Sequence, residues 1–443
     1  HLYIPKAVER GAAAVLCERK PDADVPYIRV ASAREALARL GANWFGHPAD
    51  AMTMVGITGT NGKTSSTIIL KSVLEQTLGA KVGLIGTIQN MIGDEVLHTE
   101  RTTPESFELQ ALFAKMRDAG CTHVVMEVSS HALTLSRVAG VRFAVGAFTN
   151  LTEDHLDFHK DMEDYFTSKL KIFTQSRIGC VNLDMDPVYM ERTLAFAEQN
   201  CEKTVTFGME KVGDRKPDVY GISVDEKQGW LLLKAELFGK TEEFTVNIGG
   251  AYNAYNALAA IAVTASLGVP TEIIREGLET VKVMGRMETY RLKDSVDVIV
   301  DYAHNKMSYQ VLFDYVKKQY PDRKVGFVFG CVGGKAFNRR KEAGEIAEKY
   351  ADFVVITELD PGMEDINKIC GEILSYIDHK EKAEIIADRD TAVYTALKKA
   401  EGMENCVLVL AGGSDAYMKR GNKVYPSDTD GERVQKFLKK IGK

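Results

Sequence analysis

The sequence lacks two features that would place it in a membrane or on nucleic acid. No apolar run approaches the ~18 residues that a membrane-spanning helix needs, and the opening residues contain no apolar signal region. Lys and Arg number 56 against 62 Asp and Glu, which gives a net charge of −6. This balance offers no general attraction to phosphate backbones or acidic lipids. We therefore expect neither membrane insertion nor a nucleic-acid partner.

Cysteine is sparse and shows no pairing pattern. The seven cysteines are an odd number, they form no CxxC pair, and several lie in apolar, strand-like runs, as Cys180 and Cys406 do. Disulfide frameworks and structural zinc sites both use paired or regularly spaced cysteines. We therefore predict reduced thiols in the core of a cytoplasmic protein. We also expect the protein to be a monomer.

Length and patterning predict an α/β protein of about three domains, since 443 residues correspond to ~150 residues each. Residues 1–50 are too few for an independent core, so we predict part of a first domain there. Strand-like runs alternate with helical stretches across residues 51–284 and again across 285–443, which favours mostly parallel sheets covered by helices. Within the first of these regions, residues 203–248 have the composition of antiparallel hairpins.

Helical spacing of apolar residues predicts a helix over residues 32–44, with Ala33, Leu37, Leu40 and Trp44 on its apolar side. Further helices are predicted over residues 65–78, 105–119 and 251–267.

The strongest local motif is a glycine-rich turn between a predicted strand and a predicted helix. It is a P-loop pattern, in which backbone N–H groups surround phosphate oxygens. Lys63 would reach the β- and γ-phosphates, and the Thr64 hydroxyl would ligate Mg²⁺. Ile57 stands where the strict pattern has a glycine, so this is a variant P-loop. The motif predicts nucleotide binding through Gly59, Thr60, Asn61, Gly62, Lys63 and Thr64.

Two further groups of polar residues follow predicted strands. Glu127 ends an apolar strand, where its carboxylate would suit Mg²⁺ or a structural salt bridge. His155 lies in a run of ionisable residues after the next strand, an arrangement that favours a binding site over a structural role. Lys169 lies on an aromatic-rich helix and, taken by itself, is interpreted as a surface lysine.

Taken together, these segments resemble the Mur ligases, and in particular the branch that adds the third residue of the peptide in bacterial cell-wall precursors. The resemblance spans most of the chain in family order. It is carried by residues 59–64, 102–105, 127–133, 137–140, 149–157, 252–258, 285–288 and 301–304.

The resemblance implies an N-terminal UDP-binding domain (residues 1–50, incomplete here), a central P-loop ATPase domain (51–284) and a C-terminal Rossmann-like domain (285–443). It implies an ATP-dependent amide ligase of peptidoglycan synthesis with ATP and Mg²⁺ as cofactors. ATP would phosphorylate the D-glutamyl carboxylate of UDP-N-acetylmuramoyl-L-alanyl-D-glutamate. The amine of a free amino acid would then displace phosphate from the acyl phosphate.

The resemblance also assigns roles to single residues by position. Glu127 and His155 match Mg²⁺ ligands, and Lys169 matches the lysine that the family carbamylates with CO₂, which would reverse its interpretation as a surface lysine. The matched ATP contacts are Asn256 to adenine, Asp301 to ribose and Arg286 to the γ-phosphate.

The muramoyl-dipeptide contacts match Thr102, Thr103, Ser129 and Arg137, whereas Leu135 stands where the family usually has a substrate-contacting Gln.

The segment that reads the incoming amino acid departs from the family pattern. Members that add meso-diaminopimelate carry Asp-Asn-Pro-Arg, but here Asp360 replaces the Asn and Gly362 replaces the Arg. Ala416 replaces the Glu of a second signature, and Arg340 still matches the residue that binds the α-carboxylate. Asp360 and Glu364 would suit an ammonium group. Alternatively, they are ordinary acids near the N-terminus of the following helix, where they interact favourably with its dipole. We therefore predict L-lysine as the added amino acid, with meso-diaminopimelate as the alternative.

Other interpretations stay open on sequence alone. A folylpolyglutamate synthase would share the P-loop but should lack the signatures at residues 102–104 and 127–133. The altered segment 412–416 leaves room for a non-catalytic Mur-like protein, against which the retained lysines and metal ligands argue. A GTPase would need a guanine-reading Asn-Lys-x-Asp motif, and residues 305–308 read Asn-Lys-Met-Ser instead.

Overall fold

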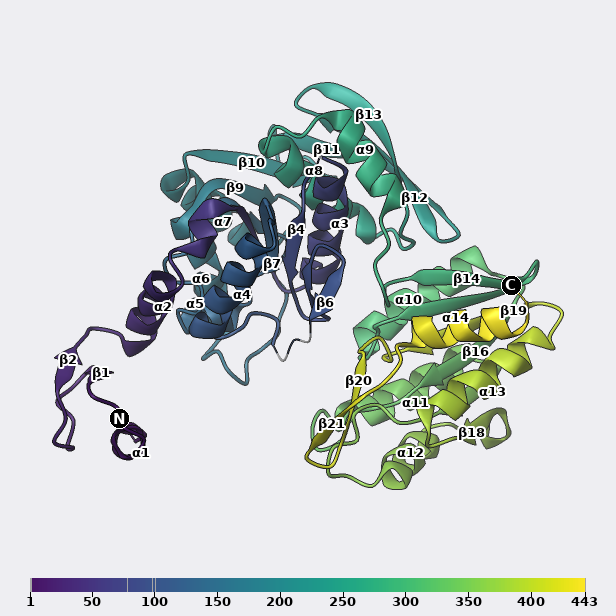
Figure 1. Ribbon diagram of the computed structural model, residues 1–443. Helices are drawn as coiled ribbons and strands as arrows, with labels where there is room; N and C mark the ends of the chain where they lie inside the picture. Colours follow the sequence, from purple (N-terminus) through teal and green to yellow (C-terminus); the bar gives the residue numbers. More distant parts are fainter. Residues whose placement is uncertain (1, 78, 98, 100, 443) are drawn as a thin grey trace. The chain divides into compact units, whose positions relative to one another are not determined.

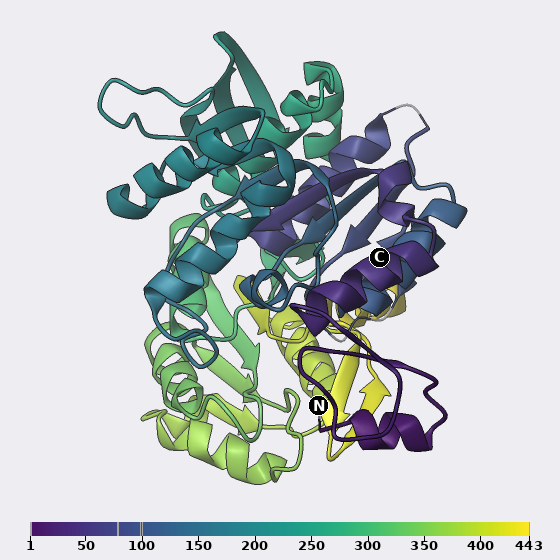
Figure 2. The same ribbon diagram turned by 90° about the vertical axis from the view of Figure 1, so that its left-hand side faces the viewer.

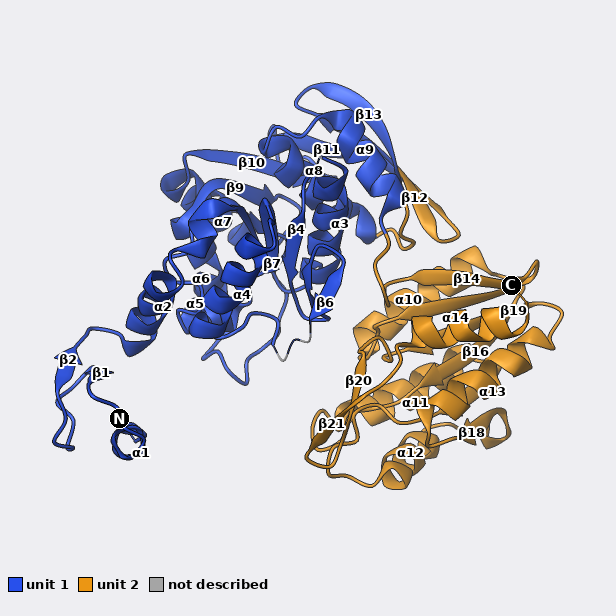
Figure 3. Ribbon diagram, viewed as in Figure 1, with its two compact units in different colours: residues 1–224, 233–245, 252–281 blue, residues 225–232, 246–251, 282–443 orange. Residues whose placement is uncertain are grey.

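The computed structural model describes residues 2–77, 79–97, 99 and 101–442 and divides into two compact units (Figure 3). Unit 1 comprises residues 1–224, 233–245 and 252–281, and unit 2 comprises residues 225–232, 246–251 and 282–443. Residues 1–50 group with unit 1. The predicted boundary at 284 lies beside residue 282, where the last segment of unit 2 begins. No helix of the described part is long and apolar enough to cross a membrane.

Unit 1 is built around an eleven-stranded sheet (Figure 1). Its central strands pair in parallel, as predicted for an α/β fold, and β5 and β6 add an antiparallel edge. In spatial order the strands are β13 (Lys240–Val246), β12 (Trp230–Leu237), β11 (Val219–Lys227), β10 (Lys203–Gly208), β9 (Ser176–Asn182), β8 (Phe143–Phe148), β3 (Thr53–Thr58), β7 (His123–Glu127), β4 (Val82–Ile85), β5 (Asn90–Ile92) and β6 (Glu95–Leu97).

Helices cover this sheet because its central strands are apolar on both faces. Along β7, Val124 and Met126 join one core cluster with Phe113 of α4, while the intervening Val125 points to the other face. Helices α3, α8 and α9 pack against one another. The helices of the unit are α3 (Lys63–Gln76), α4 (Ser106–Asp118), α5 (Ser130–Thr134), α6 (Met162–Leu170), α7 (Pro187–Asn200), α8 (Asn253–Ser266) and α9 (Thr271–Thr280). The predicted helix over residues 65–78 corresponds to α3, and residue 78 lies outside the described residues.

The N-terminal piece contains α1 (Ile4–Glu9), a parallel pair of short strands, β1 (Val15–Cys17) and β2 (Tyr27–Arg29), and α2 (Ala33–Trp44). Ser32 caps α2 by accepting a hydrogen bond from the Glu35 N–H. Helix α2, dark purple in Figure 2, packs on α4.

The apolar side predicted for α2 is wrong. Leu37, Leu40 and Trp44 are exposed, and Trp44 retains 78% of its accessible surface. The buried face is made by Ala38, Gly41 and Ala42. A Cβ on Gly41 would stand 3.4 Å from the Gln110 side chain, so this face uses small residues to let the α2 and α4 backbones approach. The small size of these side chains therefore decided which face of α2 packs against α4, and hydrophobic periodicity takes no account of side-chain size.

Unit 2 contains a six-stranded sheet whose strands are parallel except for β14. In spatial order they are β14 (Glu288–Lys293), β15 (Val296–Asp301), β19 (Cys406–Ala411), β16 (Lys324–Phe329), β17 (Phe353–Ile356) and β18 (Ala383–Ile385). The helices are α10 (Lys306–Gln319), α11 (Asn338–Tyr350), α12 (Ile366–Ser375), α13 (Arg389–Glu401) and α14 (Asp430–Lys440), and β20 (Tyr417–Arg420) pairs with β21 (Lys423–Pro426).

All seven cysteines are free thiols, and six of them are buried. Cys180 and Cys406 lie in β9 and β19, as their apolar runs predicted, and both are fully buried. Burial raises the pKa of the Cys406 thiol to about 11, so it stays protonated at neutral pH. The prediction of core thiols is therefore confirmed for six cysteines, while Cys201 is only partly buried.

A buried ion pair joins the first turns of α13 and α14. Arg389 Nε and Nη2 lie 3.0 and 2.6 Å from the Asp430 carboxylate oxygens, and both side chains are at most 1% exposed. We expect Asp430→Ala to lower the free energy of unfolding by about 3–5 kcal/mol, because it leaves a buried guanidinium without its counter-ion. Denaturant unfolding measures this, with Lys324→Ala, which breaks an exposed pair, as the control. Equal stability of the two variants would contradict the prediction.

Candidate functional site

The glycine-rich turn joins β3 to α3 and requires glycine at two positions. Gly59 has φ +143°, and a Cβ there would stand 2.0 Å from Thr149 Oγ1. Gly62 has φ +84°, and a Cβ there would stand 2.3 Å from Asn256 Oδ1. Only glycine adopts these backbone conformations without strain and admits such close neighbours. The predicted P-loop residues and the predicted adenine contact, Asn256, are thus in direct contact within unit 1.

Lys63 and the segment after β8 fix the shape of this turn. Lys63 Nζ donates hydrogen bonds to the carbonyl oxygens of Gly59 and Thr60, at 3.0 and 2.8 Å. The Asn61 N–H donates to Asn150 Oδ1 at 2.8 Å. An ammonium group held over a turn that opens a helix N-terminus provides positive potential and backbone donors for an anion. The turn therefore has the chemistry of a phosphate site.

Glu127 lies at the carboxyl end of β7, beside β3, and its carboxylate meets the start of α3. Its Oε1 accepts hydrogen bonds from Thr64 Oγ1 at 3.0 Å and from the Thr87 N–H at 2.8 Å. Its Oε2 accepts from Thr87 Oγ1 at 3.0 Å, and that hydroxyl also lies 3.0 Å from Thr102 Oγ1. A carboxylate that is 1% exposed and surrounded by hydroxyl groups offers hard oxygen donors.

This donor set fits Mg²⁺, since the Thr64 hydroxyl and the Glu127 carboxylate are adjacent. His155 is not brought into the same contact. Its side chain is 45% exposed, and its Nε2 lies 3.7 Å from an Asp154 oxygen. Within the described ranges no group of three or more His, Cys, Asp or Glu side chains lies close enough to hold a metal. The protein oxygens would therefore hold Mg²⁺ together with ligands from outside this set.

Lys169 is buried, so its interpretation as a surface lysine is wrong. The residue is 1% exposed, and its Nζ donates to Gly59 O at 2.8 Å and lies 4.4 Å from the centre of the Tyr165 ring. Burial first, and the nearby Lys63 second, lower the pKa of Lys169 well below its ordinary value. Its spacing of four residues from the buried Tyr165 on α6 was the available signal, because i and i+4 share a helix face.

The residues matched to the muramoyl-dipeptide gather around the end of β7. Thr103 Oγ1 donates to Glu127 O at 2.8 Å and accepts from the Ser129 N–H at 3.2 Å. Arg137 Nη1 donates to Thr103 O at 3.1 Å. The structure thus brings together four residues that the sequence separates by up to 35 positions. Thr102 is linked to the Glu127 carboxylate through the Thr87 hydroxyl.

In unit 2, Asp301 and Arg286 lie next to each other at the end of β15. The Asp301 carboxylate accepts hydrogen bonds from the Met287 and Ala303 N–H groups, at 2.9 and 2.8 Å, and burial raises its pKa. The Arg286 guanidinium stacks on the Tyr302 ring at 4.6 Å. Its Nε is buried and has no hydrogen-bond partner among the described residues. Arg286 thus lies at the carboxyl edge of the sheet, where ligands of such sheets bind.

Arg340 is 2% exposed and holds two carboxylates. Its Nη1 and Nη2 donate to the two Glu364 oxygens at 3.0 and 2.6 Å, and Nη1 also bonds Glu372. Hydrogen bonding to Arg340 lowers the pKa of Glu364 to about 2. Glu364 is therefore paired already, which removes one of the two acids on which the lysine prediction depended.

The other acid, Asp360, has a neighbour that sequence reasoning missed. Asp415 lies in the loop between β19 and β20, and burial together with the Asp360 charge raises its pKa to about 6. Tyr302 and Tyr417 are close to the same two acids, and burial is the main cause of the raised pKa of both phenols. Nothing in the sequence links residues 360 and 415, because they meet only at the carboxyl edge of the folded sheet.

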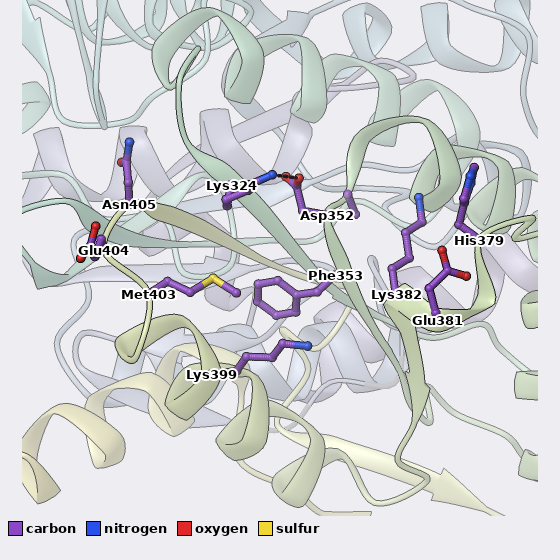
Figure 4. A pocket seen from close by; sticks show the side chains of 11 residues that line it. Lys324, Asp352, Phe353, His379, Glu381, Lys382, Lys399, Met403, Glu404 and Asn405 are labelled. Atoms are coloured by element: carbon purple, nitrogen blue, oxygen red, sulfur yellow. Dashed lines mark hydrogen bonds and ion pairs between the residues drawn. The ribbon is translucent and has the colours of Figure 1, made fainter.

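A cavity of about 910 Å³ in unit 2 is at the opposite edge of the sheet. It is lined by residues that begin or precede strands, including Lys324, Phe353 and Asn405 (Figure 4). Lys324 pairs with Asp352 at 2.7 Å across it. Ligands of parallel sheets bind outside the carboxyl ends of the strands. This cavity is therefore separate from the residues described above.

The sequence matches two family models, the Mur ligase middle domain over residues 57–264 and the Mur ligase glutamate ligase domain over residues 285–413. The chain belongs to the Mur ligase family. Like the other members of this family, it is an ATP-dependent, ADP-forming ligase, and the family prediction made from the motifs is confirmed.

Curated relatives align with nearly the whole Mur ligase chain. A protein from Caldanaerobacter subterraneus subsp. tengcongensis is 38% identical over 99% of this chain and 89% of its own length. One from Aquifex aeolicus is 36% identical over 99% and 88%. Both are named UDP-N-acetylmuramoyl-L-alanyl-D-glutamate–2,6-diaminopimelate ligase.

Solved structures agree on the fold of this Mur ligase. A UDP-N-acetylmuramoyl-L-alanyl-D-glutamate–2,6-diaminopimelate ligase superposes with a TM-score of 0.69 at 22% identity, over 100% of this chain and 90% of the other. A folylpolyglutamate synthase from Mycobacterium tuberculosis gives 0.67 at 18% identity, over 85% and 92%. At these identities the structural likeness establishes the fold and does not separate the two activities.

Proposed function

We propose that this Mur ligase adds a diamino acid, meso-diaminopimelate, to the D-glutamyl carboxylate of UDP-N-acetylmuramoyl-L-alanyl-D-glutamate. The observation that carries the proposal is the 38% identity, over 99% of the chain, to a relative with that name. The positions of the P-loop, Glu127 and the residues around Thr103 support it. The proposed reaction transfers the γ-phosphoryl group of ATP to the carboxylate, and the amine then displaces phosphate to form the amide.

Each charged group would act on a defined anion. Lys63, at the P-loop, would neutralise the β- and γ-phosphates, and Arg286 would stabilise charge on the transferred phosphoryl group. Arg137 and Thr103 would orient the dipeptide so that its carboxylate meets the phosphate. Thr64 and Glu127 would hold Mg²⁺, which supplies charge neutralisation at the phosphates when bound. Lys169, buried beside Gly59, would carry the carbamate implied by the family resemblance.

L-lysine is the second candidate for the amine, and specific residues favour it. Gly362 replaces the Arg that grips the distal carboxylate, and Asp360 with Asp415 gives that region acidic character. The relatives' names and the pairing of Glu364 with Arg340 weigh against lysine. We place meso-diaminopimelate first for these reasons.

Competition between the two amines is the direct test. The assay contains UDP-N-acetylmuramoyl-L-alanyl-D-glutamate, ATP and both amino acids at equal concentration. We expect at least about tenfold more diaminopimelate than lysine in the product, because a charge-assisted bond to the distal carboxylate raises affinity by more than about tenfold. Mass spectrometry of the UDP-linked product measures the ratio. Predominant lysine incorporation would overturn the choice of amine, and release of ADP without any product would overturn the ligase proposal itself.

A further inference from the structure

The segment after β17 contains two residues in the left-handed backbone region. Asp360 has φ +43° and Gly362 has φ +57°. A side chain at position 362 would meet open space, but its backbone conformation favours glycine. The shape of this segment therefore explains why an arginine does not stand at position 362. If the amino acid carries a distal carboxylate, its counter-ion must come from another element.

Strand β20 supplies a cation at this point. Gly362 forms a parallel bridge with Arg420, the Gly362 N–H donates to Lys419 O at 3.1 Å, and the Gly421 N–H donates to Gly362 O at 2.6 Å. These backbone bonds fix position 420 beside position 362. The hairpin β20–β21 (Figure 1) thus brings position 420 beside the segment that lacks its own arginine.

The Arg420 guanidinium is held by Glu358 and keeps free donors. Arg420 Nε lies 2.8 Å from Glu358 Oε2, and Nη2 bonds Glu358 Oε1. The Glu358 side chain is 6% exposed, whereas the Arg420 side chain is 50% exposed. Nη1 has no hydrogen-bond partner among the residues that the structure describes. Nη2 also lies 4.0 Å from an Asp388 oxygen, so two carboxylates stand on one side of the guanidinium. Nη1, on the other side, can still donate to an incoming carboxylate.

A cavity of about 420 Å³ adjoins this pair. Its lining includes Ala416, Met418 and Tyr425, the cations Arg389, Arg420 and Arg433, and the acids Glu358, Asp388, Asp390, Asp428 and Glu432. Arg389 and Arg433 are already paired with Asp430 and Asp390, which leaves Arg420 Nη1 as the donor open to a ligand. The cavity lies at the carboxyl edge of the sheet, beyond the ends of β17 and β19, unlike the cavity lined by Lys324 and Phe353. Ala416 stands where the family signature has a glutamate, so no acid from that position opposes an incoming carboxylate.

We propose that Arg420, positioned by Glu358, binds the distal carboxylate of the incoming amino acid and makes this ligase prefer a diamino dicarboxylic acid over a monocarboxylic one. This inference rests on the proposed function and adds the residue that sets its amine specificity. Asp415 and Asp360, near the same edge, would accept the distal ammonium group, so that both charges of the zwitterionic end are paired.

The test compares kcat/KM for meso-diaminopimelate and for L-lysine in the full chain. We expect Arg420→Met to lower the value for diaminopimelate about 100-fold, mainly through KM, and to leave lysine within about threefold, because only diaminopimelate loses a charge-assisted bond. Arg420→Lys should restore part of the diaminopimelate activity. Lys423→Met, an exposed cation of the same hairpin, should change neither substrate.

Arg420 also neutralises a buried carboxylate, so the design separates specificity from stability. The double variant Glu358→Gln with Arg420→Met removes both charges, and we expect it to melt near the wild-type temperature while still losing the preference for diaminopimelate. An equal loss for both amino acids, or no loss for either, would overturn the inference.

If the wild-type chain joins neither amino acid, the proposed function fails separately. Calorimetric titration of meso-diaminopimelate into the wild type and Arg420→Met then decides the role of Arg420. Weaker binding to the variant supports that role, and equal binding or no binding to the wild type overturns it.

Discussion

Lys63→Ala should abolish ATP-dependent ligation, with a loss of at least about 10³-fold in kcat/KM, while the fold stays intact. Lys63 Nζ is held by the Gly59 and Thr60 carbonyls at the opening of α3, which places its charge where phosphate oxygens would lie. Removing one preorganised oxyanion donor costs about two to three powers of ten in kcat. A cationic side chain that stabilises the transferred phosphoryl group contributes about 10³–10⁵-fold. ADP release coupled to product formation measures the effect.

The control for this experiment is Lys115→Ala, an exposed lysine of α4 in the same unit. Both variants should melt near the wild-type temperature, because neither side chain belongs to an apolar core. Near-normal turnover of the Lys63 variant at an unchanged melting temperature would mean that the turn after β3 is not the phosphate site.

Lys169→Ala should lower ligation at least about 100-fold, and short carboxylic acids should restore part of the activity. Carbamylation needs a neutral amine, and burial next to Lys63 lowers the Lys169 pKa in the direction that provides one. Above the lowered pKa the amine is neutral and can take up CO₂. As the pH falls through that pKa the amine gains a proton, so the carbamate and the activity should both decline.

Two measurements distinguish the carbamate from a merely structural lysine. Carbon-13 NMR with labelled bicarbonate should show a carbamate signal in the wild type that is absent from Lys169→Ala. Lys171→Ala, two residues further along the chain and exposed, should keep both the signal and the activity. Full activity of Lys169→Ala would rule out the carbamate.

The sequence was sufficient for the P-loop, the α/β class and the family, because each rests on local patterns. The turn from Gly59 to Thr64 is specified by residue types that fit a tight turn at a helix start, and the structure places it between β3 and α3 as predicted. The run that became β19 is continuously apolar, and so is the middle of β7, since strands buried on both faces need no alternation. Glu127 was found because a strand-end carboxylate is visible in sequence.

The tertiary structure alone decided the features that depend on distant neighbours. Lys169 is buried because α6 turns the face it shares with Tyr165 toward the P-loop, and no local pattern gives that direction. Leu40 and Trp44 are exposed because small residues on the other side of α2 pack closer to α4. Periodicity finds the apolar side of a helix, but packing distance selects the buried one.

Contacts between segments that are distant in the sequence were also decided by the tertiary structure. Glu364 is bound to Arg340, and Arg420 lies beside Gly362, although 58 positions separate the latter two in the chain. The sequence gives the net charge of a segment but not which charged groups are close together. The free energy of an ion pair depends on the distance between its two groups and on their burial. The sequence by itself determined that this protein is a phosphate-binding α/β ligase of the Mur family. The folded sheet brings separate loops together at its carboxyl edge. It thereby decided which charged side chains are paired within the protein and which can contact a substrate.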